Sequence, residues 1–209
     1  MDDWFTLKHE VEENLFKVDS ENITTFDPHL DDSLIQNYTI NCFFKEKDLT
    51  FVNILIDTLR SVDPNQLFYT PSQLHVTLLG QIDLNSDKNQ IIKTVQDFLD
   101  QNKIMFHLFG VGGGKKAAFV TAYPIGFSID KFRLKLRKVG GGKVFDDPYE
   151  KLAWINFMRY LVKPRGEFFD VLRGKTNTDF GIVKPSTIQL LKNSSRLLNG
   201  SETVHNFAI

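Results

Sequence analysis

The apolar residues at the start of the expected domain recur first with the period of a strand and then with that of a helix. Residues 38–44 are rich in aromatic and β-branched side chains, which predicts a strand. Between residues 49 and 60 the apolar positions fall at helical spacing, and Asp48 is placed to cap the first turn. The two segments predict a strand–helix pair, and the compact domain is expected to begin near Gln36.

A second pair of the same kind follows. Residues 67–69 and 74–79 form an extended run that Pro71 interrupts, because proline cannot donate a hydrogen bond to a neighbouring strand. Residues 87–100 carry a single apolar stripe, which predicts a helix with Ser86 as its N-cap. The order strand, helix, strand, helix is therefore expected over the first half of the domain.

The next segments predict a hairpin and one ambiguous element. Residues 104–109 and 117–124 have the composition of strands, and the glycines and lysines of residues 110–116 between them are typical of an exposed turn. In residues 131–138 apolar and basic side chains alternate strictly, as in a strand, whereas the serine and aspartate within residues 128–130 favour the start of a helix. We expect a helix there.

The end of the chain adds further strands. The pattern predicts a strand over residues 152–161, a short helix over 168–172, and closing strands over 187–191 and 204–209. Strands and helices thus alternate twice along the chain, which predicts an α+β protein built from two similar halves.

Composition and charge change this picture in one respect. With 209 residues, 42% apolar and 24% charged, the chain has an ordinary globular composition, and one domain is expected. The first 35 residues hold ten acids and two bases, whereas the remainder holds 16 acids and 23 bases. We therefore expect an acidic N-terminal appendage, residues 1–35, and a single domain, residues 36–209. The positive balance of the domain suits a polyanion such as RNA or a nucleotide; an ordinary solvated surface is the alternative.

Several classes of protein do not fit the sequence. It has no apolar run of about 18 residues, and its N-terminus is acidic where a signal peptide is basic, so we expect a cytoplasmic protein that uses no membrane. The single cysteine, Cys42, cannot form an internal disulfide and is expected to be a small core residue. The histidines are scattered and neither glycine cluster has Walker A spacing, so we expect neither a metal nor a cofactor. We also expect a monomer.

One pair of polar residues on a predicted strand can carry chemistry. His75 and Thr77 alternate with Leu74, Val76 and Leu78, so the imidazole and the hydroxyl point to the same face of the sheet. Such a face can bind a phosphate, with the hydroxyl donating to a phosphoryl oxygen and the histidine moving a proton. The alternative is a structural strand that happens to hold one histidine.

The segment around this pair resembles a known family. Residues 69–79, YTPSQLHVTLL, are similar to the first His-x-Thr motif of the 2H phosphoesterases, the superfamily of 2'-5' RNA ligases and cyclic phosphodiesterases. Residues 180–183 followed by 188–193 look like the last core strand of this family. The resemblance covers roughly residues 36–209, and it also favours the helix over residues 131–138. It implies a bilobal fold in which two pseudo-symmetric β-α-β halves with antiparallel-rich sheets flank a central cleft.

The expected second motif departs from the family pattern. Trp154-Ile155-Asn156 stands where His-x-Thr or His-x-Asn would lie. The mechanism that the resemblance implies uses two histidines across a cleft, one taking a proton from the attacking oxygen and the other protonating the leaving oxygen. Trp154 can do neither, because indole has an N–H donor and no basic site at neutral pH. Asn156 keeps an amide for the phosphate, and Arg159 adds a positive charge, although strand alternation places it on the face opposite to Asn156.

Other residues leave alternatives open. Trp154 either stacks on a nucleobase or fills the core of a closed cleft. Tyr69 can donate a proton or stack on a base, although the usual pKa of a phenol, near 10, makes it a poor acid–base group. His107 and His205 lie in predicted strands and are candidates to replace the missing histidine, but lone histidines there are more often packed residues.

The sequence therefore leads to rival functional hypotheses. The first is a 2H-like phosphoesterase, a hydrolase or ligase, acting on RNA ends or nucleotides with 2',3'-cyclic or 2'-5' linkages. In it His75 and Thr77 are catalytic, and Tyr69, Trp154, Asn156 and Arg159 bind the substrate. The second is a catalytically inactive module that binds RNA or a nucleotide in the same cleft. The third is a scaffold whose cleft is filled by the acidic N-terminal segment.

Overall fold

The computed structural model describes residues 23–27, 36–146, 149–194 and 201–209. It is an α+β structure built on one large sheet, in which all the described strand pairs are antiparallel. In spatial order the strands are β7 (Asp179–Val183), β4 (Met105–Gly113), β5 (Ala117–Ile125), β6 (Ala153–Arg159), β3 (His75–Ile82), β1 (Asn37–Phe43), β8 (Thr187–Asn193) and β9 (Glu202–Phe207). A short strand, β2 (Leu67–Phe68), pairs with β6.

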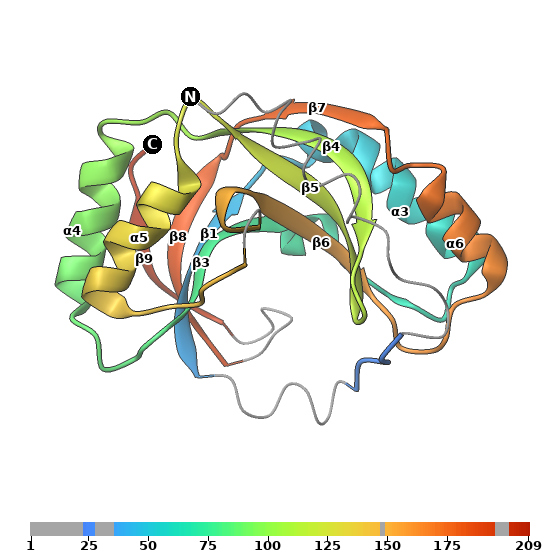
Figure 1. Cartoon of the computed structure of the whole chain (residues 1–209), viewed down its shortest axis with the longest axis horizontal. Coiled ribbons are helices and arrows are strands. Elements are labelled where there is room, and N and C mark those ends of the chain that lie inside the picture. The colour runs from blue at the N-terminus through green and yellow to red at the C-terminus, as the bar shows by residue number, and fades with distance from the viewer. Residues whose placement is uncertain (1–22, 28–35, 147–148, 195–200) are drawn as a thin grey trace.

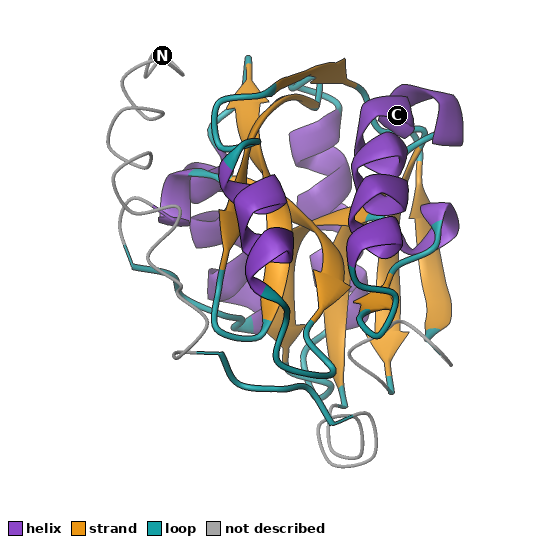
Figure 2. Cartoon of the chain, turned by 90° about the vertical axis from the view of Figure 1, so that its right-hand side faces the viewer, coloured by secondary structure: helices purple, strands orange, loops and turns teal. Residues whose placement is uncertain are grey.

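The sheet is arched, and its helices lie on the outer side (Figure 1). One helix pair, α4 (Lys88–Leu99) and α5 (Ile129–Gly140), packs at the end that contains β3 and β9. The other pair, α3 (Thr50–Val62) and α6 (Gly166–Arg173), packs at the end that contains β4 and β6. Figure 2 shows the molecule turned by 90°, with helices in purple and strands in orange. Three 3-10 turns complete the elements: η1 (Glu46–Leu49), η2 (Pro71–Gln73) and η3 (Tyr149–Lys151).

The sheet has two halves that meet between β3 and β6. The pairing of these strands is recorded at a single position, Val76 opposite Ile155, whereas the pairs within each half run for many residues. Both residues are fully buried in the main hydrophobic core, under the helices. The face of the sheet away from the helices, which we call the inner face, is therefore the one to which the neighbours of Val76 and Ile155 point.

Most of the predicted elements are confirmed. The segment with alternating apolar and basic residues is the helix α5, because its buried residues fall at helical spacing: Ile129, Phe132, Arg133, Leu136 and Gly140. The expected helix is therefore confirmed, and the strict alternation arises because Arg133, a charged residue, lies on the buried side of the helix while Leu134 is exposed. Cys42 is fully buried, as expected for a core residue.

Both predicted N-caps are wrong by one residue. Helix α3 has Leu49 at its N-cap, with no side-chain hydrogen bond, since Asp48 belongs to the preceding 3-10 turn. Helix α4 has Asp87 as its N-cap rather than Ser86, and the Asp87 carboxylate accepts from the backbone N–H of Asn89 at 2.9 Å. In the second case two suitable capping residues stand side by side, and sequence does not separate them.

Two further expectations are corrected. The turn predicted over residues 110–116 is shorter, because β4 continues to Gly113 and pairs Gly112 with Phe119 of β5. The residues expected to make one last core strand form two strands in different halves of the sheet, β7 and β8.

The appendage expected over residues 1–35 lies mostly outside the described residues. Its described part, residues 23–27, packs on the domain: Thr24 N–H donates to the Lys115 carbonyl at 2.8 Å, and Phe26 N–H to that of Tyr160 at 2.6 Å. Phe26 is 2% exposed and belongs to the main core. Among the described residues, no helix has the length and apolar character that crossing a membrane requires.

Candidate functional site

The inner face brings the residues of both motifs together across the junction of the two halves. Because Val76 lies opposite Ile155 in antiparallel register, His75 falls opposite Asn156, and Thr77 falls opposite Trp154. All four side chains are partly buried, while Val76 and Ile155 between them are fully buried on the helix side. The strands therefore present the four predicted residues as one cluster on the inner face.

The position of His75 fixes which of its nitrogens carries a proton. Its Nδ1 lies 2.7 Å from the carbonyl oxygen of Gln73, and a carbonyl can only accept, so Nδ1–H is the donor. The turn η2 holds this carbonyl in place, because the Gln73 side chain accepts from the Thr70 N–H at 2.9 Å. In neutral His75 the lone pair is therefore on Nε2, which is the arrangement that a general base needs.

The surroundings of His75 favour its neutral form. Burial lowers the pKa of His75 below 6.5, and the positive charge of Arg159 lowers it further, against the opposing effect of the hydrogen bond to Gln73. The ring of Phe43 lies 5.8 Å away, centroid to centroid, and contributes to this apolar environment. At neutral pH His75 is therefore able to accept a proton.

Arg159 lies on the inner face, which corrects the prediction from strand alternation. Asn156 pairs with Phe119 of β5, and the next recorded pair along the strands joins Met158 with Ala118, so β6 has one extra residue at this point. The extra residue is a β-bulge at Phe157, and it inverts the alternation that follows. Arg159 then pairs with Ala117, which lies on the same face as Phe119, so the guanidinium returns to the face of Asn156.

Two aromatic residues hold the Arg159 side chain. Its Nε donates to the Tyr69 hydroxyl at 2.9 Å, and its guanidinium carbon lies 5.2 Å from the centre of the Phe26 ring. Tyr69, predicted to contact substrate, is 4% exposed, so its ring is packed and its hydroxyl orients Arg159. Phe26 was not predicted as a site residue, because nothing in its local sequence connects it with Arg159.

Trp154 has aromatic neighbours on the inner face. The centroid of its ring lies 6.1 Å from that of Phe119 and 5.2 Å from that of Phe145, the latter edge to face. It packs against a second apolar cluster, separate from the main core, which contains Phe109, Tyr123 and Leu152. Trp154 is partly exposed, so it combines packing with an accessible surface.

The inner face also holds buried polar residues that sequence reasoning missed. Asn41 lies opposite Thr77, and Thr121 lies opposite Trp154, so both continue the row of site residues. They are 1% and 0% exposed, and within the described part of the chain Asn41 Nδ2 and Thr121 Oγ1 have no hydrogen-bond partner. Each interrupts an apolar run with one polar side chain, which is the signal that the sequence offered.

Neither of the other candidate histidines stands in for the missing one. His107 pairs with Tyr123 and so faces inward, but its strand is separated from β3 by β5 and β6, and its Nε2 lies 2.8 Å from Asp179 Oδ1. His205 lies opposite Leu190, a fully buried residue on the helix side of the sheet. Neither side chain belongs to the cluster around His75.

Arg133 connects the two strands of the site from the helix side. This residue is fully buried; its Nε donates to the Leu78 carbonyl at 2.8 Å, and its Nη1 donates to the carbonyls of Glu150 and Leu152 at 2.8 and 3.0 Å. Burial lowers the pKa of Arg133 to about 10, so it is charged at neutral pH. The guanidinium thus ties β3, just after Thr77, to the segment that leads into Trp154.

The site has the chemistry of anion binding and proton transfer. Within the described ranges, no three histidine, cysteine or carboxylate side chains are grouped so that they could hold a metal ion. The functional groups at hand are one imidazole, one hydroxyl, one amide and one guanidinium, from His75, Thr77, Asn156 and Arg159. These groups suit a phosphodiester, whose oxygens accept from the last three.

Comparison with known proteins defines the fold and goes no further. No protein-family model and no curated protein matches the sequence. Among solved structures, the chain is similar to TT0787 of Thermus thermophilus, with a TM-score of 0.54 and 15% identity over 83% of this chain and 97% of that one. It is also similar to ATU0111 of Agrobacterium tumefaciens, a conserved protein of unknown function, with a TM-score of 0.53 and 9% identity over 88% and 91% of the two chains. The chain therefore shares an α+β fold with both proteins.

Proposed function

We propose that this protein binds the phosphodiester of an RNA end or a nucleotide on its inner face, and that His75 is the acid–base residue of a 2H-like phosphoesterase. The observation that carries the proposal is the hydrogen bond from His75 Nδ1 to the Gln73 carbonyl, which leaves Nε2 free to take a proton beside Asn156 and Arg159. The proposal includes a cytoplasmic monomer that works without metal or cofactor.

The arrangement suits hydrolysis of a 2',3'-cyclic phosphate. A water molecule attacks phosphorus while His75 Nε2 takes its proton, and the bond from phosphorus to the 2' oxygen breaks. Thr77, Asn156 and Arg159 donate to the phosphoryl oxygens as charge builds up on them. Trp154 cannot protonate the leaving oxygen, so that proton comes from solvent. Since a positioned general acid typically contributes about 10² to 10⁴ in rate, we expect slow turnover.

The architecture supports this proposal without being specific to it. The sheet has two halves, each with its own helix pair, and His75 and Trp154 come from opposite sides of their junction. This agrees with the bilobal, pseudo-symmetric arrangement that the resemblance to 2H phosphoesterases implies. We infer that a histidine at position 154 would lie across the junction from His75, as the resemblance implies.

The test is turnover of defined substrates by the full chain. We expect slow conversion of 2',3'-cyclic nucleotides to 3'-monophosphates, or cleavage of 2'-5' linked dinucleotides, and loss of that activity in His75→Ala. The control is His205→Ala, because that histidine lies on the other face of the sheet. Equal activity in wild type and His75→Ala would overturn the catalytic assignment.

A second candidate function is binding without turnover. The observation that favours it is Trp154, which packs against Phe119 and Phe145 at the position of the second motif and offers an indole where catalysis needs a base. In this case the full chain binds cyclic nucleotides or RNA with salt-sensitive affinity, and no product forms over long incubation. Arg159→Gln weakens that binding, while His75→Ala changes it little. Product formation that depends on His75 excludes this candidate.

A further inference from the structure

Three partly exposed aromatic rings follow one another on the inner face. They are Phe119 of β5, Trp154 of β6, and Phe145 of the loop between α5 and β6; we call this set the aromatic lane. Adjacent ring centroids are separated by 6.1 and 5.2 Å. Phe119 and Trp154 pack against the second apolar cluster, away from the main core, and Phe145 reaches Trp154 from the loop before β6.

The aromatic lane begins beside the phosphate-binding groups and leads away from them. Phe119 lies directly opposite Asn156, and Trp154 lies opposite Thr77. Phe145, in the loop that follows α5, is the third ring of the lane and lies beside Trp154. A nucleic acid whose phosphodiester lies at His75 therefore has aromatic surface within reach of its neighbouring bases.

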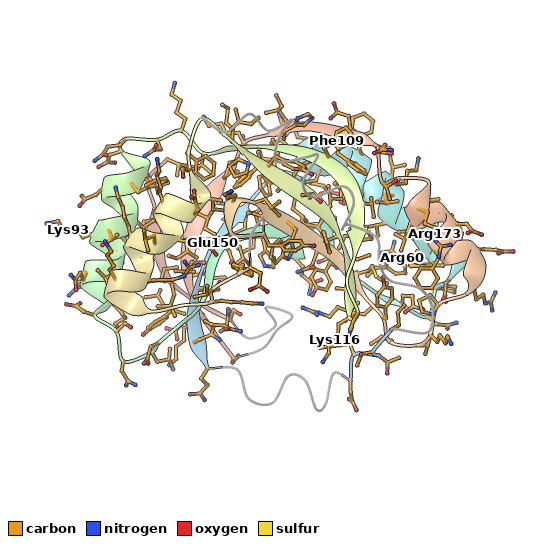
Figure 3. All side chains as sticks on the ribbon, viewed as in Figure 1. Arg60, Lys93, Phe109, Lys116, Glu150 and Arg173 are labelled. Atoms are coloured by element: carbon orange, nitrogen blue, oxygen red, sulfur yellow. The ribbon has the colours of Figure 1, made fainter. Side chains whose placement is uncertain are left out.

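The end of the lane at Phe145, which we call its outer end, is anchored and has positively charged neighbours. The Phe145 ring lies 4.7 Å from the guanidinium carbon of Arg133 and 4.8 Å from the ammonium of Lys143, which is exposed. The loop is anchored, because Lys143 N–H donates to the Gly80 carbonyl at 2.9 Å and Phe145 N–H donates to the Glu150 carboxylate at 3.1 Å. Glu150, labelled in Figure 3, is fixed in turn by Arg137 at 2.7 Å.

We propose that the aromatic lane is a subsite for nucleobases, and that the ligand of this protein is a single-stranded RNA of several nucleotides. Bases stack on Phe119, Trp154 and Phe145, and the Lys143 ammonium meets a backbone phosphate at the outer end. Stacking of this kind tolerates any sequence, since every base has an aromatic face. The inference rests on the proposed function for the position of the phosphodiester, and it adds the length and strandedness of the ligand.

The first measurement uses tryptophan fluorescence. The chain has two tryptophans, Trp4 and Trp154, so Trp4→Phe leaves Trp154 as the reporter. We expect an RNA hexamer to quench this emission and to bind at least about tenfold more tightly than a 2',3'-cyclic mononucleotide at low salt, because more than one base stacks. Equal affinities for hexamer and mononucleotide would overturn the proposal.

The second measurement removes single components of the lane in the same background. Phe145→Leu and Phe119→Leu should each weaken hexamer binding at least about fivefold, the lower end of the range for one stacked base. Phe145 lies at the end of the lane far from Asn156, so Phe145→Leu should weaken hexamer binding more than mononucleotide binding. Lys143→Ser should weaken hexamer binding and reduce its salt dependence. The matched controls are Phe51→Leu and Lys131→Ser, which alter exposed residues on the outer faces of α3 and α5 and should change nothing.

The outcomes separate this inference from the proposed function. Hexamer affinity that the lane variants leave intact overturns the subsite, even where His75-dependent turnover is present. Loss of hexamer binding in the lane variants supports the subsite, even where no turnover is found. Lys143 is exposed, so its substitution keeps the test decisive if a phenylalanine variant fails to fold.

Discussion

At the scale of single residues, the proton on His75 decides what the site can do. The carbonyl of Gln73 holds the proton on Nδ1, and burial together with the charge of Arg159 disfavours a second proton on Nε2. The same arginine is held by Tyr69 and Phe26, two residues far apart in the sequence. The protonation state of one imidazole therefore depends on side chains from three separate segments.

The pH dependence of His75 follows from these contacts. Its pKa lies below 6.5 in the folded protein, so activity should be constant near neutral pH and fall as the pH drops through that lowered value. The unfolded chain binds the proton more readily, so this residue also costs stability as the pH falls below about 6.5. We expect an NMR titration of the His75 ring to have its midpoint below 6.5.

Replacing Arg159 tests the electrostatic part of that shift. In Arg159→Gln the nearby positive charge is gone, so the NMR midpoint of His75 should rise, while burial still keeps it below that of a free histidine. Phosphodiester binding should weaken at the same time. The control is Arg173→Gln, an exposed residue paired with Asp170 on α6, which should leave the midpoint unchanged. An unchanged midpoint in Arg159→Gln would show that the guanidinium lies too far from His75 to shift its pKa.

At the scale of elements, one side chain of a helix fixes the two strands of the site. Arg133 of α5 donates to the carbonyl of Leu78 in β3 and to the carbonyl of Leu152 next to β6. β3 and β6 pair at a single recorded position, Val76 opposite Ile155. The hydrogen bonds of Arg133 therefore add to the few backbone hydrogen bonds that hold these two strands together. The geometry of His75 relative to Asn156 therefore depends on a helix that touches neither residue.

Loss of this bridge should be costly. In Arg133→Met the carbonyls of Leu78, Glu150 and Leu152 lose their donor inside the protein, and we expect the free energy of unfolding to fall by about 3 kcal/mol or more. Urea unfolding followed by circular dichroism measures this. Lys135→Met, on the exposed side of the same helix, should stay within about 0.5 kcal/mol of wild type. Similar losses in both variants would contradict the role of Arg133.

The elements were predicted better than the contacts between them. Periodicity located α3, α4, β4 and β5 because each buries one face, and a buried face leaves a regular pattern. The bulge at Phe157 left no such signal, because it depends on how β5 and β6 pair, and it reversed the expected side of Arg159. The inward turn of Arg133 was missed for the same reason, since its carbonyl partners come from distant segments.

At the scale of the whole molecule, each half of the sheet contributes one strand to the site. His75 and Thr77 come from the half that ends in β9, and Trp154, Asn156 and Arg159 come from the half that ends in β7. His75, Thr77, Trp154 and Asn156 lie at the junction of the two halves, and the bulge brings Arg159 onto the same face. On the proposed function, position 154 is therefore the place in the second half where a histidine would complete the site.

Trp154→His tests that view. Restoring a histidine opposite Thr77 supplies a group that can protonate the leaving oxygen, so we expect hydrolysis of a 2',3'-cyclic nucleotide to accelerate by about 10² to 10⁴. Trp154→Phe is the matched control, because it makes the same site smaller without adding an acid or base. Turnover no faster in Trp154→His than in Trp154→Phe would count against a phosphoesterase site.

The charge asymmetry of the chain leads to a further prediction. Residues 1–22 hold seven acids and two bases, whereas residues 23–27 include the core residue Phe26 and should be kept. Deleting residues 1–22 removes a net negative charge, so RNA binding should tighten at about 50 mM salt and approach that of the full chain at about 500 mM, where charges are screened. Equal affinity of both chains at the lower salt concentration would refute an electrostatic effect of this segment.

The bulge in β6 has a consequence for how this site tolerates change. Asn156 and Arg159 are three positions apart, an odd spacing that puts two strand residues on one face only because an extra residue intervenes. The place of the guanidinium is therefore set by the number of residues before it as much as by their identity. Inserting one residue between Ala118 and Phe119 of β5 would give Phe157 a partner, restore regular alternation and turn the arginine away from Asn156, without altering any residue that contacts a ligand.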